Sequence, residues 1–112
     1  MSAPSATALS VVEAARALEP TIRAQADQIE RDGRLPDSLV RALSEAGVFR
    51  MLVPKALGGL EVDPVTQLDV LEAISRGDGS AGWVSAIASG TAWTMAFLPP
   101  ETASEILADP HA

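Results

Sequence analysis

The amino-acid sequence predicts an all-α domain in which about five helices form an orthogonal or antiparallel bundle. Three observations lead to this prediction. Apolar residues recur at spacings of three and four, proline and glycine interrupt them at short intervals, and no convincing pair of strands is present. The 112 residues are expected to form one helical domain over residues 8–112, after a disordered stretch over residues 1–7. Short connections favour antiparallel neighbours.

The first expected helix is long and interrupted. Pro20 lies inside its apolar pattern and is expected to kink or divide it, because proline has no amide hydrogen to donate. Gly33 follows the last periodic residue and predicts the end of the helix. The residues that form the apolar stripe are Val11, Ala15, Leu18, Ile22, Ala26 and Ile29.

A short amphipathic helix is expected next, after the sequence Leu35-Pro36-Asp37. Gly47 closes it as a left-handed cap, and residues 51–54 are expected to be extended before Pro54. Gly58 and Gly59 predict a turn with a positive backbone dihedral angle. The periodic residues of this helix are Leu39, Val40, Leu43 and Ala46.

Asp63 and Pro64 form a strong start signal for the following helix, with Asp63 as N-cap and Pro64 at the first position. Its apolar period runs to Arg76, and Gly77 is expected to end it. A further helix is expected from Ala81 to about Leu98, ended by two prolines. A last short helix is expected over residues 101–108.

The helix expected over residues 81–98 is unusual because no charged residue occurs between Gly79 and Pro100. A helix that is apolar on all sides either crosses a membrane or is buried. Four hydroxyl residues, two internal glycines and the lack of a basic flank argue against a membrane span. Few other helices are present to wrap it, so one face is left over. That face either packs tightly within the domain or contributes to a ligand pocket or to a missing domain.

The turn before this helix contains Gly77, Gly79 and Gly82, which match the spacing of a dinucleotide-binding loop. That loop follows a strand, whereas the residues before Gly77 have helical periodicity, and no acidic residue lies about 20 positions further on. The turn is therefore interpreted as a joint between two helices. Gly77 caps one helix, Gly79 permits a sharp reversal, Ser80 caps the next helix, and Gly82 allows a close approach of helices or a ligand.

Composition excludes several classes of function. The net charge of -7 and the scattered basic residues argue against nucleic-acid binding, because an acidic chain repels phosphate backbones. Without cysteine there is no disulfide or Cys-based metal site, and the single histidine, His111, is penultimate, so no metal site is expected. No basic n-region or long apolar core indicates a signal peptide, so a cytoplasmic protein is expected.

Five motifs follow one another in a recognisable order: residues 33–36, 43–50, 52–60, 79–83 and 97–106, with the sequences GRLP, LSEAGVFR, LVP with GGL, GSAGW and FLPP with EI. Together they resemble the N-terminal helical domain of the acyl-CoA dehydrogenase family over residues 9–110. The resemblance implies a larger enzyme with a middle β domain and a C-terminal helical domain, which hold FAD between them while the helical domain helps to close the substrate pocket. It implies α,β-oxidation of an acyl-CoA thioester and a homo-oligomer when intact.

The chain itself is then expected to be a fragment without the catalytic carboxylate, completed either by the missing middle and C-terminal domains or by a partner subunit. It should be inactive alone and should not hold FAD alone. A stand-alone helical interaction or dimerisation module is the alternative that the leftover apolar face suggests.

The form Gly79-Ser80-x-Gly82-Trp83 resembles a sub-branch that includes flavin-dependent aromatic monooxygenases, which would use reduced flavin and a small aromatic substrate. In those hydroxylases a histidine commonly follows the tryptophan by eight positions, where this chain has Thr91. A hydroxyl cannot take up a proton near neutral pH as imidazole can, so this departure weakens the hydroxylase reading. Trp83, Ile87 and Thr91 lie on one helix face and are the candidates for lining a substrate pocket; Trp83 as a core residue is the alternative.

Overall fold

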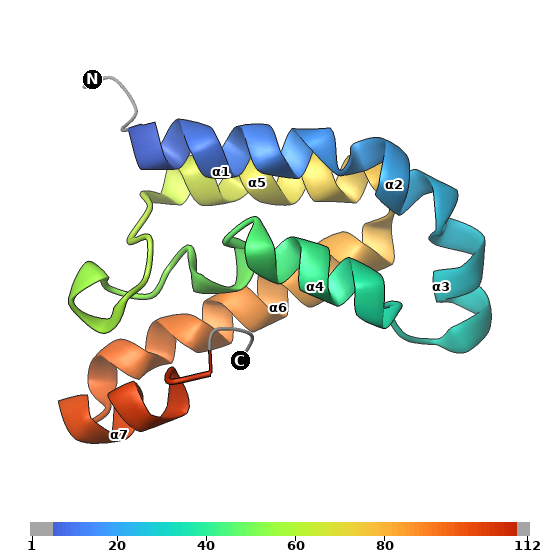
Figure 1. The fold of residues 1–112 in the computed structure, drawn as a ribbon. Helices are drawn as coiled ribbons and strands as arrows, with labels where there is room; N and C mark the ends of the chain where they lie inside the picture. Colours follow the sequence, from blue (N-terminus) through green and yellow to red (C-terminus); the bar gives the residue numbers. More distant parts are fainter. Residues whose placement is uncertain (1–5, 110–112) are drawn as a thin grey trace.

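The computed structural model describes the backbone of residues 6–109 and the side chains of residues 9–109. Within them all regular structure is helical, which confirms the predicted fold class, and the five expected helices are present (Figure 1). The first is divided into three pieces, so the labels run from α1 to α7. The α-helices are α1 (Ala6–Ala17), α2 (Glu19–Ala24), α3 (Ala26–Asp32), α4 (Asp37–Glu45), α5 (Pro64–Gly77), α6 (Gly79–Trp93) and α7 (Pro100–Ile106).

The N-terminal helix divides where the sequence predicts. Pro20 lies in the first turn of α2. Backbone amides in the first turn have no acceptor within the helix, so proline breaks no hydrogen bond there. Gly33 caps α3 with φ 65°, as predicted. The helix begins earlier than expected, because Ala6 and Thr7 are already helical instead of disordered. Residues 1–5 lie outside the described residues.

The segment between α4 and α5 is a compact loop with two short 3₁₀ turns, η1 (Val48–Arg50) and η2 (Lys55–Leu57). The predicted left-handed conformations at Gly47 (φ 91°) and Gly58 (φ 87°) are confirmed. The extended conformation predicted for residues 51–54 is wrong at Met51, which has helical angles and is buried. The loop turns back there because the Val62 N–H donates to the Met51 carbonyl over 2.8 Å.

Asp63 caps α5 as predicted, since its Oδ1 accepts a hydrogen bond from the Thr66 N–H over 2.8 Å. The hydrogen bonds from Thr66 hold the pKa of the Asp63 carboxyl below its usual value. The positive end of the helix dipole also stabilises a carboxylate at this end of α5. The start of α5 is thereby fixed by residues adjacent in sequence.

The joint between α5 and α6 differs from the prediction in its cap. Asp78, and not Ser80, is the N-cap of α6, because its Oδ2 accepts from the Ala81 N–H over 2.8 Å. The helix therefore begins at Gly79 and not at Ala81. Gly79 has no positive φ and open space around it, so no sharp reversal depends on it. Gly77 is the last residue of α5 and has no left-handed conformation either.

Two glycines at this joint are needed for packing. A Cβ atom on Gly77 would lie 2.7 Å from the Ile22 Cβ, and one on Gly82 would lie 1.9 Å from the Ser75 Oγ and 2.9 Å from the Ser75 Cβ. Gly82 thus allows α6 to approach α5 closely, as predicted, and Gly77 allows α2 to approach α5. The small side chains serve helix–helix contacts within the chain.

The helices form two layers in Figure 1, with α1, α2 and α5 above α4 and α6. Helix α6 folds back against α5, whereas α1 and α2 run in the same direction as α5. The direction follows from the order of neighbours along the helices: Arg16 lies near Asp69, and Ile22, further along the chain, lies beside Gly77. The prediction of antiparallel neighbours concerned helices joined by short connections, such as α5 and α6, and α2 is separated from α5 by two α-helices and a loop.

The principal core lies between α1–α4, η1 and α5. The smallest extent of the Cα atoms is 17 Å, so the molecule is flat. Since packed helix axes lie about 8–10 Å apart, a helix in such a molecule keeps one open side. The largest fully buried apolar residues are Ile22, Leu39, Leu43, Val48, Met51, Val53, Val70 and Ile74.

The uncharged helix α6 is shorter than expected. It ends at Trp93 and continues as a 3₁₀ turn, η3 (Thr94–Phe97), before two prolines. No helix among the described residues combines the length and hydropathy needed to cross a membrane. The apolar character of α6 therefore requires a different explanation, which its two faces provide.

Candidate functional site

Helix α6 buries one narrow face made of small residues. Gly82, Ser85 and Ser89 are buried there, and the Ser89 Oγ donates to the Ser85 carbonyl over 2.8 Å. The Ser85 Oγ is buried and has no hydrogen-bond partner among the described residues. Small side chains allow α6 to approach its neighbours closely, and they leave the larger residues of the helix for its other side.

The opposite face of α6 is apolar and exposed. Trp83 is 68% exposed and Ile87 is 51% exposed, and Thr91, four positions further on, lies on the same side of the helix. A core position for Trp83 is therefore excluded within this chain. The three predicted pocket residues share one exposed face, but Trp83 and Ile87 are not among the residues that line the cavity described next.

Thr91 lines a cavity on one side of α6. This space, about 340 Å³, opens between α6, η1 and α7, and we call it the α6–α7 cavity. Sequence periodicity identified neither Phe49 nor Ile106 as lining residues, because η1 and α7 meet α6 only in the folded chain. Its lining consists of Phe49, Ala88, Thr91, Ala92, Met95, Ile106 and Leu107.

Arg50 fixes the α7 side of this cavity. Its Nη2 donates to the Leu107 carbonyl over 2.9 Å and also to the Asp109 carbonyl. These carbonyls follow the last turn of α7, where a cation is favoured by the helix dipole. The Arg50 Nε is buried without a partner in the part of the chain that the structure describes. The guanidinium thus ties η1 to a segment 57–59 residues away.

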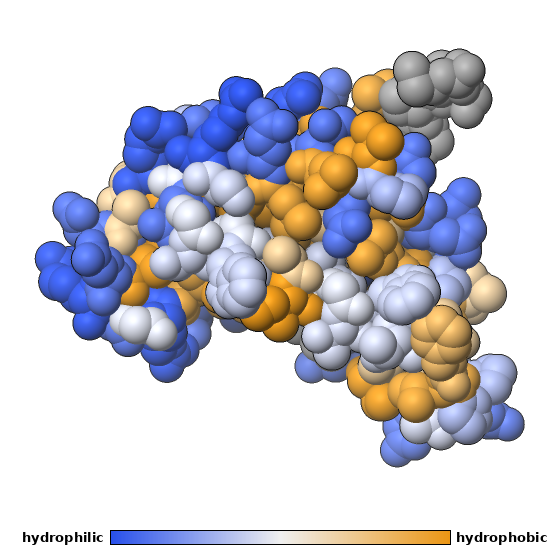
Figure 2. Space-filling view, turned by 180° about the vertical axis from the view of Figure 1, so that it is seen from behind, coloured by the Kyte–Doolittle hydropathy of each residue, from blue (hydrophilic) through white to orange (hydrophobic). Residues whose placement is uncertain are grey.

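Exposed apolar side chains extend beyond α6. Figure 2 shows apolar and weakly polar atoms gathered over the middle and lower part of the face seen from behind, while strongly hydrophilic atoms lie along its outer edges. Trp93 and Phe97 form an edge-to-face pair with ring centroids 5.0 Å apart, and Phe97 is 70% exposed. Val65 and Leu68 on α5 are also exposed. Contiguous apolar surface of this kind indicates an interaction site.

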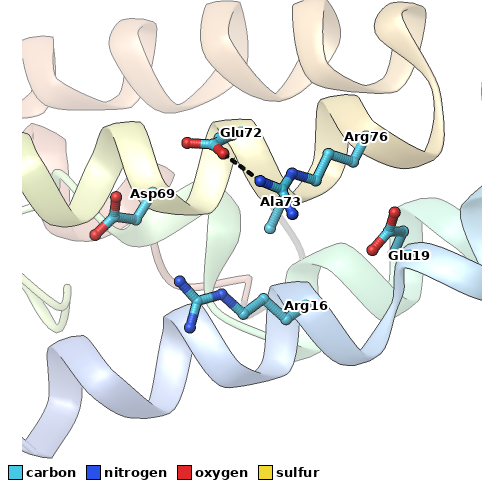
Figure 3. A pocket seen from close by; sticks show the side chains of 6 residues that line it. All are labelled: Arg16, Glu19, Asp69, Glu72, Ala73 and Arg76. Atoms are coloured by element: carbon cyan, nitrogen blue, oxygen red, sulfur yellow. Dashed lines mark hydrogen bonds and ion pairs between the residues drawn. The ribbon is translucent and has the colours of Figure 1, made fainter.

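A second hollow, about 180 Å³, lies between α1–α2 and α5 and is lined mainly by charged residues (Figure 3). Arg76 pairs with Glu72 over 2.8 Å, and Glu19 pairs with Arg23 of its own helix over 2.8 Å. Arg16 extends from α1 toward α5 in the same view. Exposed pairs of this kind contribute only about 0.2–1 kcal/mol each. The hollow is therefore a solvated seam between helices.

Two of the three glycines in the predicted turn lie against other parts of the chain, and the described residues hold no cluster of metal-ligating side chains. Among residues 6–109 no three His, Cys, Asp or Glu side chains gather as a metal site, and His111 lies outside the described residues. A phosphate cradle needs free backbone beside its glycines. Here the space beside Gly77 is filled by Ile22 and the space beside Gly82 by Ser75.

Comparison with known proteins agrees with the helical architecture. The model of the acyl-CoA dehydrogenase N-terminal domain matches residues 7–105. The chain is 37% identical, over 80% of its length, to the oxygenase subunit HsaA of a flavin-dependent monooxygenase from Rhodococcus jostii. It is 39% identical over 75% of its length to the indole-3-acetate monooxygenase of Pseudomonas putida. It is also 30% identical, over 75% of its length, to the oxygenase component of an FADH(2)-dependent resorcinol hydroxylase from Rhizobium.

These matches cover 24%, 21% and 20% of the respective relatives, so the chain spans less than a quarter of the length of those proteins. The family match, in contrast, extends over nearly the whole chain. The chain therefore belongs to the acyl-CoA dehydrogenase family, as its N-terminal helical domain, and its relatives include flavin-dependent monooxygenases.

Proposed function

We propose that the chain is the N-terminal domain of a flavin-dependent aromatic monooxygenase, and that the exposed face of α6 helps to close its substrate pocket. The observation that carries this proposal is the uncharged face with Trp83, Ile87 and Thr91. The names of the similar proteins support the reaction class, because they are oxygenase components and hydroxylases, two of them named for indole-3-acetate and resorcinol.

An exposed tryptophan is well suited to contact a planar substrate. Removing apolar surface from water stabilises a complex by roughly 25 cal/mol per Å². Aromatic pairs add about 0.5–1.5 kcal/mol when rings stack with an offset or meet edge to face. Trp83 provides such a ring, and Ile87, one turn further along, extends the apolar surface. No charged side chain of α6 interrupts it.

The flavin, FAD or its reduced form, is then held by parts of the enzyme outside this chain. The glycine turn at residues 77–82 packs against Ile22 at Gly77 and against Ser75 at Gly82, which argues against a pyrophosphate cradle there. We expect the isolated chain to purify without FAD and to be inactive. Stoichiometric yellow flavin on the purified chain would contradict this. We further propose that the intact enzyme is a cytoplasmic homo-oligomer completed by a middle β domain and a C-terminal helical domain.

A second candidate is an acyl-CoA dehydrogenase that oxidises the CH–CH group of an acyl thioester. One observation favours it: Thr91 stands where the hydroxylase branch commonly has a histidine. A threonine hydroxyl can accept and donate hydrogen bonds, but it does not exchange a proton near neutral pH. In the monooxygenase, proton transfer at the substrate would therefore need a group outside this chain.

The complete reading frame that encodes the chain distinguishes the two candidates. Its product is supplied with reduced flavin, oxygen and either resorcinol or indole-3-acetate, and in parallel with acyl-CoA esters and an artificial electron acceptor. We expect oxygen-dependent hydroxylation of an aromatic compound. Oxidation of acyl-CoA without any hydroxylated product would assign the dehydrogenase reaction instead.

A variant tests the role of the α6 face in the same assay. Trp83→Ala is expected to raise KM at least about tenfold, the change that about 1.4 kcal/mol of lost contact produces. Val40→Ala is the matched control, because Val40 is an exposed apolar residue on α4. Equal KM values for the two variants would show that Trp83 does not contact the substrate.

A further inference from the structure

We propose that a groove beside the end of α6 holds an arginine side chain from the part of the intact enzyme that lies outside this chain. The guanidinium group pairs there with Glu61 and stacks on Trp93, and we call the site the Glu61–Trp93 groove. The contact concerns the assembly of the enzyme. It is therefore independent of the reaction proposed above, and its test involves no measurement of activity.

The groove is formed by segments that are separated in the sequence. They are the loop between α4 and α5, the start of α5 and the end of α6, which lie at the same end of the molecule in Figure 1. Its volume of about 490 Å³ exceeds that of the α6–α7 cavity and accommodates a whole side chain. Apolar walls suit the methylene stem of a long basic residue. The residues of these walls are Leu52, Pro54, Val62 and Pro64.

Glu61 gives the groove its charge. Of the residues that the structure describes, only Glu61 brings an ionisable side chain to the lining. Its Oε1 accepts a hydrogen bond from the Lys55 backbone N–H over 3.2 Å, and within residues 9–109 no cation pairs with it. A single carboxylate among apolar walls is complementary to a single cation, and hydrogen bonds between ionised partners are the stronger ones.

The backbone of Glu61 indicates that this carboxylate is needed where it lies. Glu61 has φ 47°, and no other non-glycine residue among residues 6–109 has a positive φ. Glycine adopts this conformation more readily, so a glutamate here points to a use for its side chain. The Glu61 N–H donates to the Val53 carbonyl over 3.0 Å, which holds the loop in place. The carboxylate is thereby positioned before a partner binds, which lowers the entropic cost of binding.

Trp93 and Gln67 make arginine the best-suited cation. Trp93 is 52% exposed and packs edge to face with Phe97, and tryptophan attracts cations over its ring more strongly than other aromatic residues. The Gln67 side-chain amide makes no hydrogen bond in the described part of the chain and offers a carbonyl oxygen. A planar guanidinium group with five donors can stack on the ring and bind both oxygen acceptors, whereas an ammonium group is compact and strongly hydrated.

The arginine must come from outside this chain or from a second copy of it, because no described arginine lines the groove. A second copy is disfavoured, since each chain carries a net charge of -7 and like charges oppose association. Most of the length of the matched relatives, in contrast, has no counterpart in this chain. We therefore assign the arginine to that remaining part of the enzyme.

The head group of an arginine side chain is the probe for the isolated chain. The 112-residue chain is titrated with ethylguanidinium chloride, and NMR follows the indole N–H signals of its two tryptophans, with sodium chloride at equal ionic strength as the reference. We expect a saturable shift at Trp93, with a dissociation constant on the order of 10 mM. Trp83 is exposed outside the groove and should not shift. Equal shifts at both tryptophans would overturn the proposal.

Two variants of Glu61 and one control make the titration specific. Glu61→Gln keeps the shape of the side chain but removes its charge, and it should weaken binding at least about fivefold. Glu30→Gln is the control, because Glu30 is exposed on α3, and it should leave binding unchanged. Glu61→Gly should lose the binding while raising Tm by about 3 °C, since glycine relieves the backbone at this position. Unchanged binding in Glu61→Gln, or a lower Tm in Glu61→Gly, would overturn the proposal.

The arginine is identified in the product of the complete reading frame. Phenylglyoxal modifies accessible guanidinium groups, and mass spectrometry measures the rate at each arginine. We expect one arginine outside residues 1–112 to react at least about fivefold faster in Glu61→Gln than in the unchanged protein, and at the unchanged rate in Glu30→Gln. The absence of such an arginine would overturn the proposal. A faster rate at an arginine within residues 1–112 instead would overturn it in favour of contact between two copies of the chain.

Discussion

Helices α5 and α6 meet at Asp78 and pack against each other, yet the chain buries them very differently. Helix α5 carries charged residues and still buries Val70, Ala73 and Ile74 against α1 and α2. Helix α6 carries no charge, buries only small residues and leaves Trp83 and Ile87 exposed. The hydropathy of a helix therefore does not predict its burial in this chain. The difference indicates that the apolar side of α6 is reserved for a contact beyond the residues described.

The largest expected effect contrasts the buried isoleucine of α5 with the exposed one of α6. Ile74→Ala removes a fully buried side chain from the core and should lower the free energy of unfolding by about 2–5 kcal/mol. Ile87→Ala removes a half-exposed one and should change it by less than about 0.5 kcal/mol. Urea unfolding of the two variants measures both. Similar losses would mean that α6 is covered, for example by a second copy of the chain.

The next contrast lies in the glycines of the joint. Gly82→Ala places a Cβ atom 2.9 Å from the Ser75 Cβ and should cost about 1–3 kcal/mol, because α6 must move away from α5. Gly79→Ala meets open space and should stabilise by up to about 1 kcal/mol through the unfolded state. Thermal and urea unfolding give the sign of each change. A destabilised Gly79→Ala would restore a role for that glycine in the turn.

A smaller effect separates the two possible caps of α6. Asp78→Ala removes the acceptor of the Ala81 N–H and should destabilise by about 1 kcal/mol. Ser80 is exposed and does not cap α6, so Ser80→Ala should change stability by less than about 0.5 kcal/mol. A larger loss of stability for Ser80→Ala than for Asp78→Ala would show that Ser80 is the N-cap of α6.

The smallest expected effect concerns the cap of α5. The pKa of Asp63 is lowered in the folded chain by its hydrogen bonds from Thr66. A lowered folded pKa gives stability that is fully present above the unfolded value of about 3.9 and is lost as pH falls through the folded pKa. Asp63→Asn should therefore flatten the stability profile below about pH 4. NMR titration of the carboxyl carbon gives the direction of the shift, and an Asp63 pKa at or above the unfolded value would refute it.

Signals that act within a few residues were readable in the sequence. Pro20 divides the first helix, Gly33 ends α3 and Asp63 caps α5, because proline geometry, left-handed caps and side-chain caps are local. The cap of α6 was misplaced by two residues, since aspartate and serine are both good caps and only the backbone at Asp78 decides between them.

Features that depend on contacts between residues far apart in the chain could not be predicted from the sequence. The shared direction of α2 and α5 rests on the approach of Ile22 to Gly77, 55 positions apart. Periodicity placed Trp83, Ile87 and Thr91 on one face of α6, but it did not show that Phe49 and Ile106 meet Thr91 across the α6–α7 cavity. Helical periodicity reports one helix at a time, whereas a cavity is a property of three elements together.

The α6 face is open in this domain, and the proposed function requires that it be covered in the intact enzyme. Hydroxyl-radical footprinting with mass spectrometry measures it residue by residue, on the 112-residue chain and on the product of the complete reading frame. We predict that Trp83 is oxidised rapidly in the chain and at least about tenfold more slowly in the intact protein, while Val40 reacts at similar rates in both. Equal oxidation rates of Trp83 in the two proteins would contradict the account.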